Sequence, residues 1–102
     1  CSSDLKWALE YVSEEPELFR VVMKHQRAVE RIRLLIVERI TQDLKPESQS
    51  AVKIDAMANM LAGSVLGIFY WWLENPDKLS ADELLLLFSE ITLEGVQTHL
   101  NR

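Results

Sequence analysis

Few polar side chains in this chain have a spacing that could support chemistry. Arg39 and Asp43 are four residues apart, so they can pair on one face of a helix. They lie within the apolar stripe of Leu35, Ile36 and Ile40, which predicts an inward-facing position. A charged pair on an inward face forms a structural salt bridge or binds a polar group of a ligand. The salt bridge is favoured, and the ligand-binding alternative stays open.

Catalytic, metal and cofactor sites are not indicated. Cys1 is terminal and has no evident base beside it. His25 and His99 fall near helix ends, where exposed histidines are common, and no third ligand stands at a recognisable metal-binding spacing. There is no glycine-rich phosphate loop, and the carboxylates lie on polar helix faces. We therefore expect no enzyme, no metal and no cofactor.

Length and composition indicate one globular domain over residues 1–102, with 48% hydrophobic and 26% charged residues. The net charge of −5 opposes direct binding to nucleic acid. Basic residues cluster between Arg20 and Arg39, but Glu30 and Glu38 interrupt them, which is typical of a solvated helix face. One cysteine and no signal peptide favour a cytoplasmic location. The missing initiator methionine suggests a fragment of a longer protein.

The periodicity of apolar residues predicts an all-α fold, a small bundle of about five helices. Pro16 suits the first turn of a helix, and Ser80 with Glu83 predicts a capping box. Whether residues 17–44 form one helix or two stays open. The expected helices cover residues 4–12, 17–25, 27–44, 51–74 and 81–100.

The helix expected over residues 51–74 is apolar nearly all round, with Asn59, Ser64 and Tyr70 as the polar side chains of its central part. Its length reaches the lower bound for a membrane-spanning helix. Because the other helices are amphipathic, we favour a helix that is covered by protein. No membrane partner is expected. One face is bulky and suits the core: Ile54, Ala58, Leu61, Val65, Ile68 and Trp72. The other face holds Ala56, Asn59, Met60, Gly63, Gly67 and Tyr70.

This second face predicts contact with a partner. Gly63 and Gly67 form a shallow groove that admits another helix, although close packing within one chain is an alternative. The last helix also has more apolar surface than one small core can cover. One of its faces holds Leu84, Leu87, Phe88, Ile91 and Gly95. Two such helices predict a homodimer with a four-helix interface.

A known family has a similar layout. Residues 58–76 (ANMLAGSVLGIFYWWLENP) resemble the penultimate helix of TetR-family transcriptional regulators, and residues 79–84 (LSADEL) resemble the start of their final helix. Residues 9–12 (LEYV) and 15–19 (EPELF) are similar to the beginning of their regulatory domain. The resemblance spans nearly the whole chain, but no single motif is diagnostic. It implies a C-terminal ligand-sensing and dimerising domain, whose N-terminal helix-turn-helix domain is absent from this chain.

An effector pocket is expected between the bulky side of the long helix and the helices before it. Plain core packing is the favoured alternative for these residues. The candidate lining residues are Phe19, Met23, Met57, Leu61, Ile68 and Trp72, with Arg39 and Asp43 as the polar contacts.

The leading hypothesis is the effector-sensing and homodimerisation domain of a TetR-like repressor, with a possible small apolar effector. Such a domain would contact DNA only through the absent N-terminal domain. One alternative is a stand-alone helical protein–protein interaction module without a ligand. Another is a small ligand-binding or enzymatic bundle, which would need a buried polar cluster beyond Arg39 and Asp43.

Overall fold

Five helices make up the part of the chain that the computed structural model describes, residues 2–44 and 50–100. The first four are α1 (Ser2–Glu14), α2 (Pro16–Met23), α3 (Gln26–Asp43) and α4 (Ala51–Glu74). The last helix consists of α5 (Ala81–Phe88), a π-helical segment η1 (Ser89–Leu93) and α6 (Glu94–Leu100). These described residues include no β-strand. The predictions for Cys1 and for the connection beginning at residue 45 lie outside them.

Local signals in the sequence place most helix ends. Pro16 occupies the first turn of α2, as expected. The helix ends at Met23, and His25 adopts an extended conformation as the N-cap of α3. Residues 17–44 therefore form two helices, and the question left open by the sequence is resolved.

Both predicted ends of α4 are confirmed, and so is the capping box of α5. The Ser50 hydroxyl accepts a hydrogen bond from the Lys53 amide at 3.1 Å at the start of α4. The Ser80 hydroxyl accepts from the Glu83 amide at 3.1 Å, and the Ser80 amide donates to the Glu83 carboxylate at 3.0 Å. These bonds satisfy amides that the first turn of a helix leaves without partners.

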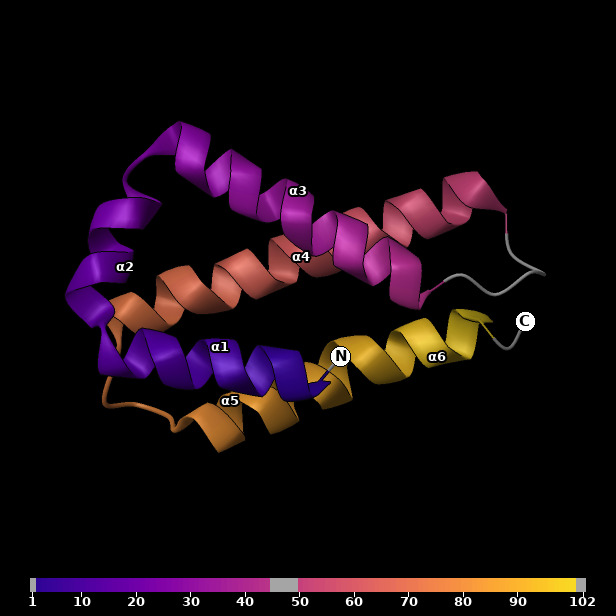
Figure 1. Cartoon of the computed structure of the whole chain (residues 1–102). Coiled ribbons are helices and arrows are strands. Elements are labelled where there is room, and N and C mark those ends of the chain that lie inside the picture. The colour runs from indigo at the N-terminus through magenta and orange to yellow at the C-terminus, as the bar shows by residue number, and fades with distance from the viewer. Residues whose placement is uncertain (1, 45–49, 101–102) are drawn as a thin grey trace.

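The helices pack around α4. Figure 1 shows α3 lying along α4, and α1 lying along α5, with α2 closing one end of the bundle. The predicted core face of α4 is confirmed, because five of its six residues are buried and Ile68 is half-buried. Leu9 and Val12 of α1 and Ile40 of α3 are buried in the same core cluster. By length and composition alone α4 is able to cross a membrane, but here one face is covered by the other helices.

Side-chain hydrogen bonds tie the C-terminal half of α4 to other segments. The Arg20 guanidinium of α2 donates to the Leu73 carbonyl at 2.8 Å. This carbonyl lies at the C-terminal end of α4, where the helix dipole favours a positive charge. The Tyr70 hydroxyl donates to the Met23 carbonyl at 3.3 Å. The Trp72 indole donates to the Leu79 carbonyl at 2.9 Å. The end of α4 is thus held by α2 and by the turn before α5.

The π-helical segment interrupts the last helix, which the sequence predicts as a regular one. The Glu94 amide donates to the Ser89 carbonyl, five residues back, and the Thr92 hydroxyl donates to the Phe88 carbonyl. A threonine that bonds back to the preceding turn competes with the regular helical ladder. The segment accommodates one extra residue in the turn and so shifts the register of the residues that follow it.

Candidate functional site

The solvent-facing side of α4 is the most distinctive surface of the protomer. Ala56, Met60, Gly63 and Gly67 are all exposed, and the Met60 side chain is 70% exposed. No charged residue occurs in α4 between Ala56 and Trp71. An exposed helix face that carries no charge over four turns is unusual for a surface that stays in water.

The glycines of α4 and of the last helix have open space beside them in the part of the protomer that the structure describes. A Cβ atom built at Gly63, Gly67 or Gly95 would meet nothing within 4 Å. None of the three has a positive φ, so no backbone turn requires glycine there. Each costs about 1 kcal/mol of helix stability relative to alanine. Within the described residues, close packing in one chain therefore does not account for Gly63 and Gly67.

A shallow hollow of about 240 Å³ joins this side of α4 to the last helix. Leu87 and Ile91 lie at its rim, and their side chains are 48% and 68% exposed. The lining is almost wholly apolar: Ser64, Ile68, Leu84, Leu87, Phe88, Ile91 and Thr92. We call the combined area the α4–α5 surface, defined by Ala56, Met60, Gly63, Gly67, Leu87 and Ile91.

Two residues predicted at the dimer interface belong instead to the core of the protomer. Leu84 and Phe88 are only 5% and 8% exposed, and they lie in the same core cluster as Leu9 and Val12 of α1. The correction arises because α1 covers this row of α5. Leu87, Ile91 and Gly95, predicted for the same interface, are exposed.

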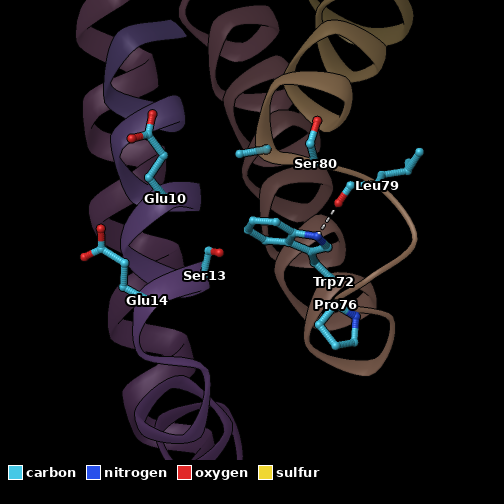
Figure 2. A pocket seen from close by; sticks show the side chains of 8 residues that line it. Glu10, Ser13, Glu14, Trp72, Pro76, Leu79 and Ser80 are labelled. Carbon is cyan, nitrogen blue, oxygen red and sulfur yellow. Dashed lines mark hydrogen bonds between the residues drawn. The ribbon is translucent and has the colours of Figure 1, made fainter.

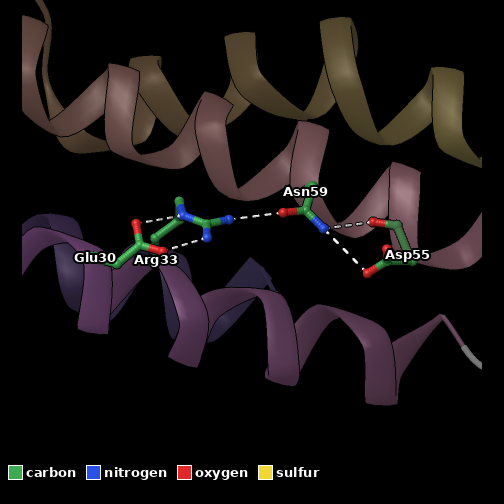
Figure 3. Close-up of polar contacts among 4 residues, drawn as sticks. All are labelled: Glu30, Arg33, Asp55 and Asn59. Carbon is green, nitrogen blue, oxygen red and sulfur yellow. Dashed lines mark hydrogen bonds and ion pairs between the residues drawn. The ribbon is translucent and has the colours of Figure 1, made fainter.

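Asn59 bonds to α3 rather than leaving its side chain free for a partner. Its carbonyl oxygen accepts from the Arg33 guanidinium at 2.8 Å, and its amide donates to the Asp55 carbonyl at 2.9 Å. Figure 3 shows the chain of polar contacts from Glu30 through Arg33 to Asn59 and Asp55. The hydrogen bond from Arg33 lowers the pKa of Glu30, and the same contact raises the pKa of Arg33. Asn59 therefore links α3 to α4 at the edge of the α4–α5 surface.

Tyr70 is a second predicted interface residue with a contact inside the protomer. Replacing it with phenylalanine is expected to cost about 1 kcal/mol of unfolding free energy, because the hydrogen bond to the Met23 carbonyl is lost. The affinity between protomers should not change. Urea denaturation measures the first effect and sedimentation equilibrium the second.

Tyr11→Phe is the matched control for this prediction. Tyr11 is 41% exposed and Tyr70 is 44% exposed, and Tyr11 has ring contacts but no hydroxyl hydrogen bond within the described residues. Its substitution should leave stability unchanged. Equal losses in the two variants would contradict the role given to the Tyr70 hydroxyl.

The predicted effector-pocket residues form packed core rather than the wall of one cavity. Met23, Met57, Leu61 and Trp72 are buried. Phe19 and Ile68 are half-buried against the same cluster. Trp72 and Ile68 line two separate hollows rather than a common one. The favoured alternative, plain core packing, describes their position.

Arg39 and Asp43 do pair, with the Arg39 Nε atom 3.7 Å from an Asp43 carboxylate oxygen. The prediction that they face inward is wrong, because their side chains are 61% and 36% exposed. The physical reason is the helix register. Leu35, one turn before Arg39, is also exposed, whereas Ile40 is buried, so the inward row of α3 runs beside this pair.

A second hollow, of about 330 Å³, lies between the end of α1 and the turn before α5. Figure 2 shows Glu10, Ser13 and Glu14 on one side and the indole of Trp72 on the other. The two carboxylates do not point toward the indole, so the polar groups do not converge on one position. His25 and His99 are exposed, and no three metal-ligating side chains gather within residues 2–44 and 50–100.

Comparisons with known proteins give no match of any kind. No protein-family model fits the sequence, no curated protein is significantly similar to it, and no solved structure is significantly similar to its fold.

Proposed function

We propose that this chain is the dimerisation and regulatory domain of a TetR-like transcriptional regulator, and that it pairs with a second copy through the α4–α5 surface. The observation that carries the proposal is the pair Gly63 and Gly67. Both glycines lie on an exposed, uncharged helix face, and a Cβ atom at either one would have no neighbour within 4 Å among the described residues. Glycines at helix–helix contacts allow two backbones to approach closely.

Charge supports a second copy as the partner. The chain carries a net charge of −5, so two copies repel each other over most of their surface. The exposed part of α4 from Ala56 to Trp71 has no charge. An interface with two-fold symmetry brings the same patch of both copies together, so an uncharged patch avoids this repulsion.

The regulatory half of the proposal rests on the resemblance to the TetR family and on the character of the core. Met23 of α2 lies in the core cluster, and Met57 of α4 is also buried. Flexible methionine side chains adapt to an apolar guest. A ligand that binds there acts as an effector if it favours one arrangement of the two protomers over another.

A fusion to a DNA-binding domain tests the proposal. A helix-turn-helix domain that binds its operator only as a dimer is placed before residue 1, and repression of a reporter gene is measured. Because the two half-sites must be occupied together, we expect the fusion to repress at least about tenfold better than the DNA-binding domain alone.

The same fusion carrying Gly67→Leu is the control, and it should lose this gain. A fusion that represses no better than the DNA-binding domain alone, although the protein is present and helical, would overturn the proposal. A purified chain that is monomeric at micromolar concentration in light scattering would do the same.

A further inference from the structure

Lys53 and Glu74, at the two ends of α4, carry charges that the helix itself disfavours. Lys53 is in the first turn, where the helix dipole favours acidic side chains, and Glu74 is the last residue, where it favours basic ones. Each placement works against the helix by a modest amount. Two locally unfavourable charges in one helix indicate that an interaction outside this helix compensates for them.

Neither charge is compensated within the part of the protomer that the structure describes. No ion pair there involves Lys53 or Glu74. The Glu74 residue is exposed, and Lys53 is half-exposed. Both side chains are therefore available for a contact with another molecule.

The two charges belong to the same row of α4 as Met60 and Gly67. Positions 53, 60, 67 and 74 are seven residues apart, and residues at this spacing lie almost one above the other on a helix. Met60 is 70% exposed, and nothing occupies the space beside Gly67. The row thus presents, in order, a positive charge, a bulky apolar side chain, a gap and a negative charge.

We infer that α4 pairs with α4 of a second copy in antiparallel orientation along this row. The inference rests on the proposed dimer and specifies its register. A two-fold axis that passes between positions 63 and 64 brings position 53 opposite 74 and position 60 opposite 67. Lys53 then faces the partner subunit's Glu74, and Met60 fills the gap beside the partner subunit's Gly67.

This register is self-complementary in both charge and shape. Because the axis relates the two copies, each contact occurs twice. The seven-residue repeat corresponds to helices that cross at about 20°, so the charged ends stay near each other over the length of α4. The last helix, with Leu87 and Ile91 exposed beside α4, completes the contact at its side.

Charge reversal tests the register. In Lys53→Glu two glutamates face each other at both ends of the pair, so we expect the dimer Kd to rise about tenfold at low ionic strength. Glu74→Lys should have the same effect. The double variant Lys53→Glu/Glu74→Lys restores opposite charges and should return the Kd to within about twofold of the original. Sedimentation equilibrium of the 102-residue chain measures all four proteins.

Two features separate this result from unfolding and from a general effect of net charge. Both single changes improve the match with the helix dipole, so circular dichroism should show helix content that is not reduced. Lys24→Glu makes the same change in net charge as Lys53→Glu, at an exposed position between α2 and α3. Glu38→Lys makes the same change as Glu74→Lys, at an exposed position of α3. Both control variants should leave the dimer Kd unchanged.

The outcomes are distinguishable from a failure of the proposed function. If the chain dimerises and Gly67→Leu prevents it, but the single reversals have no effect, the antiparallel register is wrong and the dimer stands. Reversals that weaken the dimer without rescue in the double variant also exclude the Lys53–Glu74 contact. A monomeric parent chain overturns both proposals.

Discussion

Replacing Gly67 with leucine is expected to convert the proposed dimer to a monomer while the protomer stays folded. The added side chain meets nothing in its own protomer, because a Cβ atom at this position has no neighbour within 4 Å. Leucine also favours the helix more than glycine does by about 1 kcal/mol. In the proposed pair the new side chain occupies the space that the partner subunit's Met60 fills. Two such clashes of about 1–3 kcal/mol each raise the Kd by about thirtyfold or more.

Sedimentation velocity over a range of concentrations measures this effect, and thermal denaturation checks the fold. Gln97→Leu is the matched control, since it adds a leucine at an exposed position of α6 that is not part of the α4–α5 surface. The Gln97→Leu protein should remain dimeric. Both variants should still unfold in one cooperative thermal transition, because the protomer stays folded in each. A Gly67→Leu protein with unchanged Kd would show that another face forms the dimer.

Trp72→Ala is expected to lower the free energy of unfolding by about 3–5 kcal/mol, a much larger loss than that expected for Tyr70→Phe. The side chain is 6% exposed and belongs to the central core cluster. Its indole also donates to the Leu79 carbonyl at 2.9 Å, which ties the end of α4 to the turn before α5. A domain of this size has a total stability of roughly 5–15 kcal/mol, so a large part of it would be lost.

Urea denaturation followed by circular dichroism measures the loss, and the neighbouring residue provides the control. Trp71 is 42% exposed, so Trp71→Ala removes a side chain of the same type with far less buried surface. The loss of unfolding free energy in Trp71→Ala should be much smaller than in Trp72→Ala. The loss in Trp72→Phe should lie between these two values, because phenylalanine keeps most of the packing but loses the hydrogen bond to Leu79. Similar losses at positions 71 and 72 would contradict the core position of Trp72.

Features that depend on local sequence were predictable. The limits of α4 follow from Ser50 before it and from Asn75-Pro76 after it, and the Ser80–Glu83 capping box is as expected. The buried face of α4 follows from the helical spacing of its bulky residues, since a row that starts with Ile54 and Ala58 returns to the same side every three or four residues.

Features that depend on contacts between distant segments were less predictable. The partners of Asn59 and Tyr70 lie in α3 and at the end of α2, which their place in the sequence does not reveal. The same holds for Leu84, which α1 covers. The predicted side of Arg39 is wrong because the apolar stripe that suggests it includes the exposed Leu35, and a shift of one residue turns a helix by about 100°.

The π-helical segment had only a weak signal in the sequence. Thr92 can bond back to the Phe88 carbonyl, but many threonines in helices do so without an extra residue in the turn. What the sequence does contain is the seven-residue row that includes Lys53 and Glu74. It becomes informative only because neither charge has an ion-pair partner among the described residues and because Gly67 has an open side.

The single core bears on how the proposed dimer would form. All five helices contribute side chains to it, and within the described residues no buried side-chain polar atom lacks a hydrogen-bond partner. The core of one protomer is thus built from residues of that protomer, without side chains from a second copy. The fraction of paired chains then depends on how many copies are present. Pairing governed by mass action alone rises gradually with concentration, so a scarce chain of this kind would stay mostly monomeric.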